Sequence, residues 1–393
     1  MNYIINQVFL ARKSKRKEND MSTVPQFHGS DLEEIEKYYK IPKEEIVGFG
    51  ANVNPLGLSP FVKEKLTSNL DIITTYPDRN YTSLRKAISR YCNVDVGHIV
   101  VGNGSTELIS MLIHHRHPKR ALLLGPTYSE YERELTLCGG EIVMYNLSSD
   151  NDFQLDFDDF FKHLDNSIDL LIICNPNNPT SSAITLSDME RILKHCKERD
   201  IFVMVDETYV EFAPRVEDIT AMPLVSNYDN IMILRGVSKF FAAPGLRLGY
   251  GVTSNIRFLN VILKNQNPWT LNSIGAYAGE LMLQDTEYIS KTRTLILEEH
   301  KKIHSALLEI PELHAYNPMA NFILVKILKE GVSSFDVFDF LIRRKLMVRD
   351  CASFTCLEGE YIRFCIMKPE DNKRLLEGLT DFFKQDTKKS ESN

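Results

Sequence analysis

The sequence predicts an α/β fold, with a large domain built on a mostly parallel sheet flanked by helices and a smaller α+β domain. Between residues 98 and 234, short apolar runs alternate with helical patterns, as expected for parallel strands joined by helices. After residue 250 this alternation gives way to long helices and a few further strands. The chain has 393 residues, enough for about two or three domains.

The apolar runs of the large domain are short enough to be strands. The expected strands are His98–Val101, Ala121–Leu124, Glu141–Tyr145, Asp169–Cys174, Ile201–Val205 and Ile231–Leu234. Several of them run into Gly, Asn or Asp. Ligands of such sheets bind beyond the carboxyl ends of the strands, so we expect the functional residues there.

The clearest helix is predicted to begin at Ser187, where Ser187 and Glu190 match a capping box. Apolar residues then recur at the i, i+3, i+4 and i+7 positions of one helix face. They are Met189, Ile192, Leu193 and Cys196.

After Tyr250 two long connecting helices are expected, at roughly Ser273–Leu283 and Thr286–Leu308. A smaller α+β unit then closes the chain, with expected strands near Asn321–Ile327, Leu346–Arg349 and Tyr361–Ile366 and a last helix at Asp371–Phe383. The arm around Phe27–Asn54 is expected to join this unit. The predicted division is an extension at 1–22, the arm and part of the small domain at 23–75, the large domain at 76–270, and connecting helices with the C-terminal small domain at 271–393.

Composition excludes several classes of protein. The formal net charge is −7 and the basic residues are scattered, which argues against a nucleic-acid partner. Seven cysteines without a CxxC pair favour reduced thiols in a cytoplasmic protein, and no metal site is expected. No apolar run approaches the ~20 residues that span a bilayer. Residues 1–22 place a short apolar piece before a basic cluster, unlike a secretory signal. We expect a disordered extension there, with a membrane-surface helix as the alternative.

The stretch from Ser238 to Tyr250, SKFFAAPGLRLGY, offers a hydroxyl, a lysine and an arginine. Apolar neighbours lower the pKa of a lysine, and such a lysine can form Schiff bases. Ser238 and Arg247 carry the donors that a phosphate needs. A lysine beside a phosphate site suggests pyridoxal phosphate (PLP) attached to Lys239; a surface lysine at a strand end is the alternative.

Further polar motifs follow the other strands. The run Gly102–Glu107, with Gly104, Ser105 and Thr106, opens a helix, and its free N–H groups suit an anion. A helix N-cap at Ser105 is the simpler alternative. Tyr128 follows the next strand, where it stacks on a flat ring or packs in the core.

Two more strand ends carry polar side chains. Asn178 lies in NPNNPT after the strand LLIIC, and its amide suits a phenolic oxygen. Asp206 ends the strand IFVMV, with Tyr209 three residues later. A buried carboxylate needs a partner, which is either a protonated pyridine nitrogen or an ordinary salt bridge.

In order and position these motifs resemble the fold-type I PLP enzymes of the class I/II aminotransferase family, over roughly residues 49–383. The resemblance implies that Lys239 holds PLP covalently, Asp206 pairs with the pyridine nitrogen, and Asn178 and Tyr209 contact the phenolic oxygen. Tyr128 would stack on the ring. The implied phosphate ligands are Gly104, Ser105, Thr106, Ser238 and Arg247, together with Tyr76 from the partner subunit of a homodimer. Arg363 would bind the substrate carboxylate.

Four stretches are similar to the threonine-phosphate decarboxylase branch, and the histidinol-phosphate aminotransferase branch is the next nearest. These stretches start at Phe27, Phe49, Gly102 and Val348. They imply that the substrate contacts His28, Gly29, Asn54 and Arg349. The sequence departs from the family pattern at Ser30, Ser181 and Cys356, where glycine is usual.

The resemblance therefore implies decarboxylation of a phosphorylated hydroxyamino acid, most directly L-threonine O-3-phosphate in cobalamin biosynthesis. The alternative is an aminotransferase acting on histidinol phosphate or a related amino acid. A non-catalytic, ligand-sensing domain of aminotransferase type is a third possibility; the intact lysine motif and the lack of a DNA-binding domain before Phe27 speak against it.

Overall fold

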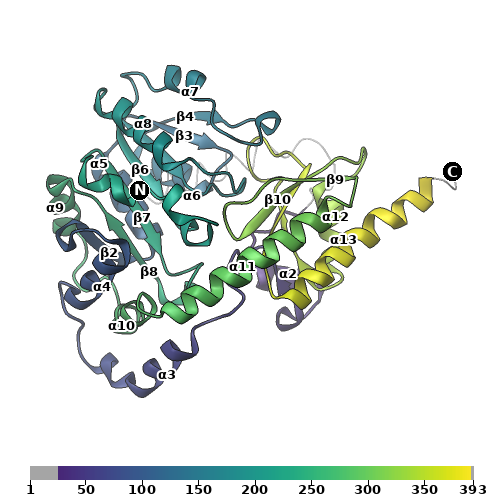
Figure 1. Ribbon diagram of the computed structural model, residues 1–393, viewed down its shortest axis with the longest axis horizontal. Coiled ribbons are helices and arrows are strands. Elements are labelled where there is room, and N and C mark those ends of the chain that lie inside the picture. The colour runs from purple at the N-terminus through teal and green to yellow at the C-terminus, as the bar shows by residue number, and fades with distance from the viewer. Residues whose placement is uncertain (1–24, 391–393) are drawn as a thin grey trace, which may run out of the picture.

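The computed structural model describes residues 25–390, arranged around one large and one small sheet (Figure 1). The extension expected at 1–22 lies outside these residues. In the part of the chain that is described, no helix is both long and apolar enough to cross a membrane.

The large sheet has seven strands in the order β2-β8-β7-β6-β5-β3-β4. In sheet order they are Ile99–Asn103, Leu248–Val252, Ile231–Gly236, Phe202–Asp206, Leu170–Cys174, Arg120–Gly125 and Glu141–Asn146. Only β8 runs antiparallel to its neighbours. The six strands expected for this domain are all present, and the sheet is mostly parallel, as predicted.

Helices cover both faces of this sheet, so its strands other than the edge strand β4 are largely buried on both sides (Figure 1). The helices of the large unit are α4 (Thr82–Cys92), α5 (Ser105–Arg116), α6 (Ser129–Cys138), α7 (Phe157–His163), α8 (Leu186–Lys197), α9 (Ile256–Asn265) and α10 (Ser273–Met282). Alternate residues of one strand face different cores. In β6, for example, Val203 packs in one apolar cluster and Met204 in the other.

The predicted helix after β5 exists, but its start was placed too late. Helix α8 is capped by Thr185, whose Oγ1 accepts from the Asp188 N–H at 3.2 Å. Thr185 and Asp188 thus take the roles expected of Ser187 and Glu190, because Thr185, two residues before Ser187, also carries a hydroxyl and caps the helix. The predicted buried face of Met189, Ile192, Leu193 and Cys196 is confirmed.

The smaller unit contains the antiparallel sheet β12-β13-β10-β9. Its elements are β9 (Leu313–Ala315), β10 (Phe322–Ile327), β12 (Arg349–Asp350), β13 (Tyr361–Cys365), α11 (Thr286–Leu307), α12 (Ser334–Ile342) and α13 (Pro369–Ser390). Helix α11 runs from the α10 side of the large unit to the small sheet (Figure 1).

The N-terminal arm packs on the small unit. Strand β1 (Val47–Gly48) pairs in parallel with β11 (Leu346–Met347). Helices α2 (Leu32–Tyr39) and α3 (Pro60–Ser68) precede α4. Short 3-10 helices occur at Lys43–Glu45, Leu70–Thr74, Val96–His98, Ser149–Asn151, Val210–Phe212, Val216–Asp218, Met222–Ser226 and Pro244–Leu246. The exact domain boundaries at residues 76 and 271 stay a prediction.

Strand β8 was not predicted from the sequence, because its glycines weaken the strand pattern. Close packing requires glycine at position 249, because a Cβ there would lie 2.4 Å from the Ser105 nitrogen and 2.5 Å from the Gly104 carbonyl carbon, both backbone atoms. Strand β8 can therefore lie beside the start of α5 only because it lacks a side chain there, and this brings Arg247 to the same place.

Candidate active site

A cavity of about 340 Å³ lies beyond the carboxyl ends of β5, β6 and β7. It is lined by the arm, by the large unit and by the small unit, including Gly50, Lys239 and Arg363. This is the place that the strand-end motifs predicted for ligand binding. Most of the residues predicted for the site line it, but Asn54, Tyr76 and Gly104 do not.

Lys239 lies in the loop between β7 and β8. Its Nζ donates to the Ala51 carbonyl oxygen at 2.6 Å. Burial, followed by the positive charge of Arg363, lowers the pKa of Lys239 to about 8. A lysine with this pKa is partly neutral near physiological pH and can attack a carbonyl carbon.

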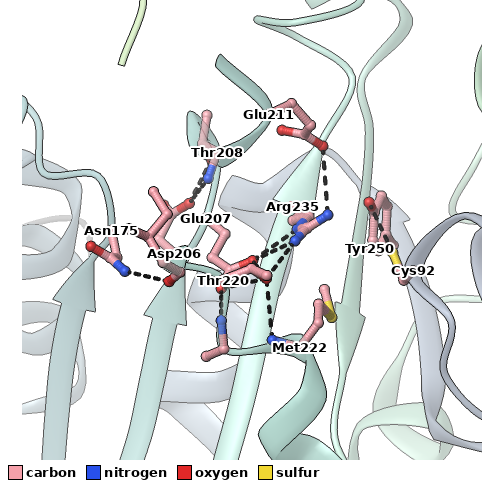
Figure 2. A network of polar contacts seen from close by, with 12 residues as sticks. Cys92, Asn175, Asp206, Glu207, Thr208, Glu211, Thr220, Met222, Arg235 and Tyr250 are labelled. Carbon is pink, nitrogen blue, oxygen red and sulfur yellow. Dashed lines mark hydrogen bonds and ion pairs between the residues drawn. The ribbon is translucent and has the colours of Figure 1, made fainter. Parts of the chain in front are cut away.

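Asp206 ends β6 and is buried, with 4% of its surface exposed. Its Oδ1 accepts from the Thr208 N–H at 3.0 Å and from Thr208 Oγ1 at 2.5 Å, and its Oδ2 accepts from the Tyr131 hydroxyl at 2.8 Å. The next residue, Glu207, turns instead toward Arg235 in a separate buried network (Figure 2). The salt-bridge alternative for Asp206 is absent among the described residues, which leaves it available to a cationic ligand.

Asn178 and Tyr209 lie on the cavity wall near Arg363. Asn178 Oδ1 accepts a hydrogen bond from Arg363 Nη1. The Tyr209 hydroxyl accepts from Asn52 Nδ2 at 3.4 Å, and burial raises its pKa. Asn52 was not singled out from the sequence, although it lies within the motif that begins at Phe49.

Hydroxyls, N–H groups and a guanidinium converge at the start of α5. The helix N-cap is Gly104, with φ +82°, and Ser105 is its first residue. The alternative of an N-cap at Ser105 is therefore wrong. A Cβ at Gly104 would come within 2.5 Å of Arg247 Nη2, so only glycine lets this arginine approach the helix. Ser105, Thr106, Ser238 and Arg247 all line the cavity.

Tyr128 lines the same cavity from the residue before α6. Its ring meets the ring of Tyr131 edge to face, with centroids 5.6 Å apart and an interplanar angle of 87°. Burial raises the pKa of Tyr128 to about 12, so this phenol stays neutral.

A second polar region, on the small unit, holds His28, Arg349 and Arg363. Arg349 Nη2 donates to Ser353 Oγ at 2.7 Å, and Arg363 Nη2 donates to the Gly50 carbonyl at 2.7 Å. Neither arginine forms an ion pair with a carboxylate of the described residues. Burial, and then Arg349, lowers the pKa of His28.

Gly29 lines this region beside Gly50, and a Cβ on Gly29 would lie 2.3 Å from the Gly50 carbonyl oxygen. Ser30 follows, and its Oγ lies 3.1 Å from His28 Nδ1. Ser181, at φ +60°, accepts through Oγ from the Met319 and Ala320 N–H groups at 3.1 and 2.9 Å. Cys356 also adopts a glycine-like φ of +68°.

Two predicted site residues lie elsewhere. The Asn54 amide is buried and donates to the Phe240 carbonyl at 2.7 Å, Thr292 Oγ1 at 2.9 Å and Tyr288 Oη at 3.0 Å. Those bonds use its donors, so Asn54 supports the arm and does not face the cavity. Tyr76 is 80% exposed, and its ring centroid lies 4.8 Å from that of Trp269 with the two rings tilted by 36°.

The residues present fit PLP. Its aldehyde needs an amine, its pyridine nitrogen a carboxylate, and its phosphate a set of N–H, O–H and guanidinium donors; Lys239, Asp206 and the start of α5 offer these. Arg363 Nε is buried without a hydrogen-bond partner, a donor that remains for an anion. Fold and site together define an enzyme of the fold-type I PLP class.

The chain belongs to the aminotransferase class I and II family, whose model matches residues 44–379. It is 34% identical to a threonine-phosphate decarboxylase from Salmonella typhimurium, over 90% of this chain and 95% of the relative. It is also 32% identical to a histidinol-phosphate aminotransferase from Methanococcus aeolicus, over 90% and 94%. PLP is the cofactor of this family.

Solved structures share the fold. A histidinol-phosphate aminotransferase from Clostridium acetobutylicum superposes with a TM-score of 0.80 and 30% identity, covering 85% of this chain and 98% of that one. One from Sinorhizobium meliloti, solved in complex with pyridoxal-5'-phosphate, has a TM-score of 0.80 and 19% identity, over 92% and 96%. The predicted fold class is confirmed.

Proposed function

We propose that this protein decarboxylates L-threonine O-3-phosphate to (R)-1-amino-2-propanol O-2-phosphate and CO2, within cobalamin biosynthesis. The observation that carries the proposal is the pair Arg349 and Arg363, two buried guanidinium groups that face one cavity without a carboxylate partner among the described residues. Such a pair suits a substrate with two anionic groups. Threonine phosphate carries a carboxylate and a phosphate.

The cofactor roles follow from the chemistry of each contact. In this proposal Lys239 would bind PLP covalently, Asp206 would accept a hydrogen bond from the pyridine nitrogen, and Asn178 and Tyr209 would contact the phenolic oxygen. Tyr128 stacks on the ring, while the start of α5 and Arg247 hold the phosphate. PLP supplies an electron sink for the bond at the substrate Cα that lies perpendicular to its ring.

The chain's own residues then decide which bond breaks. Arg363 lies beside Asn178 and Lys239, so it binds the substrate carboxylate close to the cofactor. Arg349, with Ser353 and His28, binds the substrate phosphate. Together they would orient the substrate carboxylate relative to the cofactor, and Lys239 would supply the proton that replaces the carboxylate at Cα.

Transamination of histidinol phosphate is the second candidate. It is favoured by the 32% identity to the Methanococcus aeolicus enzyme and by the Clostridium acetobutylicum structure. The same cofactor contacts serve either reaction, and only the orientation of Cα differs. Four sequence stretches, with the phosphate-binding residues proposed for the arm, favour decarboxylation.

Incubation of the PLP-loaded protein with each compound separates the two reactions. We expect CO2 and an aminopropanol phosphate from threonine phosphate with no 2-oxoglutarate present. Strict dependence on 2-oxoglutarate, with glutamate as a product, would instead assign an aminotransferase. Lys239→Ala is the matched control, since it should abolish product formation from both substrates.

We further propose a cytoplasmic homodimer with shared sites. Apolar side chains are exposed near Tyr76, namely Leu70, Ile73 and Trp269 at 51%, 61% and 42% exposure. Such a patch suits a protein partner. With it covered by a second copy, Tyr76 would reach the phosphate end of the partner's cavity.

Subunit complementation tests the shared site. Tyr76→Ala and Lys239→Ala variants should each be weakly active or inactive alone. Mixed and refolded together, they should recover up to about a quarter of the activity, because half of the dimers are mixed and each of these has one intact site. No recovery in proven mixed dimers would refute the sharing.

A further inference from the structure

Tyr131 on α6 is a buried tyrosine that reaches the carboxylate proposed to pair with PLP. Its side chain is 1% exposed, and its hydroxyl donates to Asp206 Oδ2 at 2.8 Å. The bond joins α6 to the end of β6. This bond was not predicted from the sequence, because no local pattern distinguishes Tyr131 from the other residues around it.

The hydrogen bonds that the Asp206 carboxylate accepts leave one of its acceptor positions for a further donor. An ionised carboxylate has about four acceptor positions, two on each oxygen. Thr208 donates both hydrogen bonds that Oδ1 accepts, one from its N–H at 3.0 Å and one from its Oγ1 at 2.5 Å. Among the described residues Tyr131 is the donor to Oδ2. A pyridine N–H therefore has to approach Oδ2, the oxygen that Tyr131 holds.

Tyr131 also favours the charged form of Asp206. Burial raises the pKa of this carboxyl, while the hydrogen bonds from Thr208 and Tyr131 lower it. Burial and the nearby Asp206 raise the pKa of Tyr131 itself, so the phenol keeps its proton and remains a donor.

The ring of Tyr131 supports a second cofactor contact. It meets Tyr128 edge to face at 5.6 Å, and Tyr128 is the residue proposed to stack on PLP. One side chain thus fixes both the aromatic wall and the carboxylate of the cofactor site.

We propose that Tyr131 is a positioning residue for PLP, whose hydroxyl directs Asp206 Oδ2 at the pyridine nitrogen and keeps the carboxylate ionised. The nitrogen then stays protonated, the form in which the ring withdraws electrons best. The inference rests on the role proposed for Asp206. It does not depend on which reaction follows, so substrate-free measurements test it separately.

The experiment replaces Tyr131 by Phe in the holoenzyme, which removes the hydroxyl and keeps the ring. Two quantities are measured without substrate, namely the dissociation constant of PLP and the 15N chemical shift of the pyridine nitrogen of labelled PLP. We expect PLP to bind roughly tenfold to a hundredfold more weakly, the range for losing a hydrogen bond to a charged group. The 15N signal should move toward the unprotonated form.

Tyr250→Phe is the matched control. Tyr250 is 2% exposed, and its hydroxyl contacts Cys92 Sγ at 3.5 Å in a region away from Asp206 (Figure 2). Losing this buried hydroxyl should leave both PLP measurements unchanged. A matching change in Tyr250→Phe would show that the Tyr131 effect is general destabilisation and would overturn the inference.

A double-mutant cycle with Asp206→Asn shows through which group Tyr131 acts. In the Asp206→Asn background, Tyr131→Phe should have no further effect on either measurement. Additive effects, or a Tyr131→Phe holoenzyme indistinguishable from wild type, overturn the inference. If Asp206→Asn alone leaves the 15N shift unchanged, the role proposed for Asp206 fails first.

Should Tyr131→Phe not fold, 3,5-difluorotyrosine placed at position 131 keeps both ring and hydroxyl. Its more acidic phenol changes the strength of the bond to Asp206. We expect a displaced 15N signal, and an unchanged one contradicts the inference.

Discussion

Arg349 and Arg363 are direct partners across the antiparallel ladder of β12 and β13. Like charges placed directly opposite each other destabilise a sheet, and here both side chains are buried, at 8% and 5% exposure. Neither is neutralised by a carboxylate ion pair among the described residues. The small sheet therefore carries an electrostatic cost, which the anionic substrate that we propose would reduce.

This pairing predicts the effect of removing one guanidinium. Arg349→Gln should raise the KM for threonine phosphate by about tenfold to a hundredfold, since a charge-assisted contact to the phosphate is lost. Arg349→Lys should rescue little, because an ammonium cannot form the bidentate contact. Steady-state kinetics measure both. Arg374→Gln, which removes an exposed arginine of α13 paired with Asp371, is the control. An unchanged KM in Arg349→Gln would remove Arg349 from the substrate site.

The lowered pKa of Lys239 predicts a pH profile for cofactor attachment. With the pKa near 8, the fraction of neutral amine rises with pH and reaches half at about pH 8. The rate at which apoenzyme forms its Schiff base with PLP should follow this curve, and stopped-flow absorbance measures it. Arg363→Gln should shift the midpoint to higher pH, because Arg363 is the largest charge effect on Lys239. Arg349→Gln is the control, and an equal shift in that variant would contradict the assignment.

Glu211, which lies outside the cavity, should make the stability of the folded protein depend on pH. Burial raises its pKa to about 7, both carboxylate oxygens lack hydrogen bonds, and Arg235 Nη1 lies 3.9 Å away (Figure 2). The unfolded chain ionises this group from about pH 4.5, whereas the folded protein keeps the proton until about pH 7. Its contribution to stability is therefore most favourable below pH 4.5, falls between 4.5 and 7, and is constant above.

Glu211→Gln removes this titration. The variant should be more stable than wild type at pH 8, by up to roughly 3 kcal/mol, and close to wild type at pH 5. Urea unfolding at the two pH values measures the difference. A variant that is less stable at pH 8 would mean that Glu211 is a well-paired anion of Arg235.

Ser181 carries a side chain at a backbone angle that favours glycine, and its hydrogen bonds should offset part of the cost. Its Oγ accepts from the N–H groups of Met319 and Ala320, although its φ is +60°. Ser181→Ala keeps the unfavourable φ and loses the acceptor, so it should cost about 2 kcal/mol of unfolding free energy. Ser181→Gly should cost less, because glycine adopts this φ freely. Urea unfolding ranks the three proteins, and an alanine variant as stable as wild type would contradict this order.

Much of the fold could be predicted from the sequence, because strands that are buried on both faces are plain apolar runs. Lys239, Asp206 and Arg247 were predicted to lie together, and all three line the cavity. Asp206 ends β6 and Lys239 follows β7, and the ends of neighbouring parallel strands meet at one edge of the sheet. Strand β8 was missed because Gly249 is explained by close packing in the folded protein, and the glycines of the strand leave no strand-like apolar pattern in the local sequence.

The site could be predicted less well where contacts cross from one unit to another. Asn54 was expected at the substrate, but its amide is used by Phe240, Tyr288 and Thr292, residues far away in the chain. Asn52 and Tyr131 were missed for the same reason. Nothing local distinguishes them, and their partners Tyr209 and Asp206 become neighbours only in the folded chain.

The most direct test of the proposed reaction is to follow both products of carboxyl-13C threonine phosphate in D2O, with PLP and without any oxo acid. The account predicts 13CO2 and aminopropanol phosphate in equal amounts, with one deuteron on the carbon that lost the carboxylate. Threonine phosphate that exchanges its Cα proton without releasing 13CO2, or that reacts only when 2-oxoglutarate is added, would contradict it.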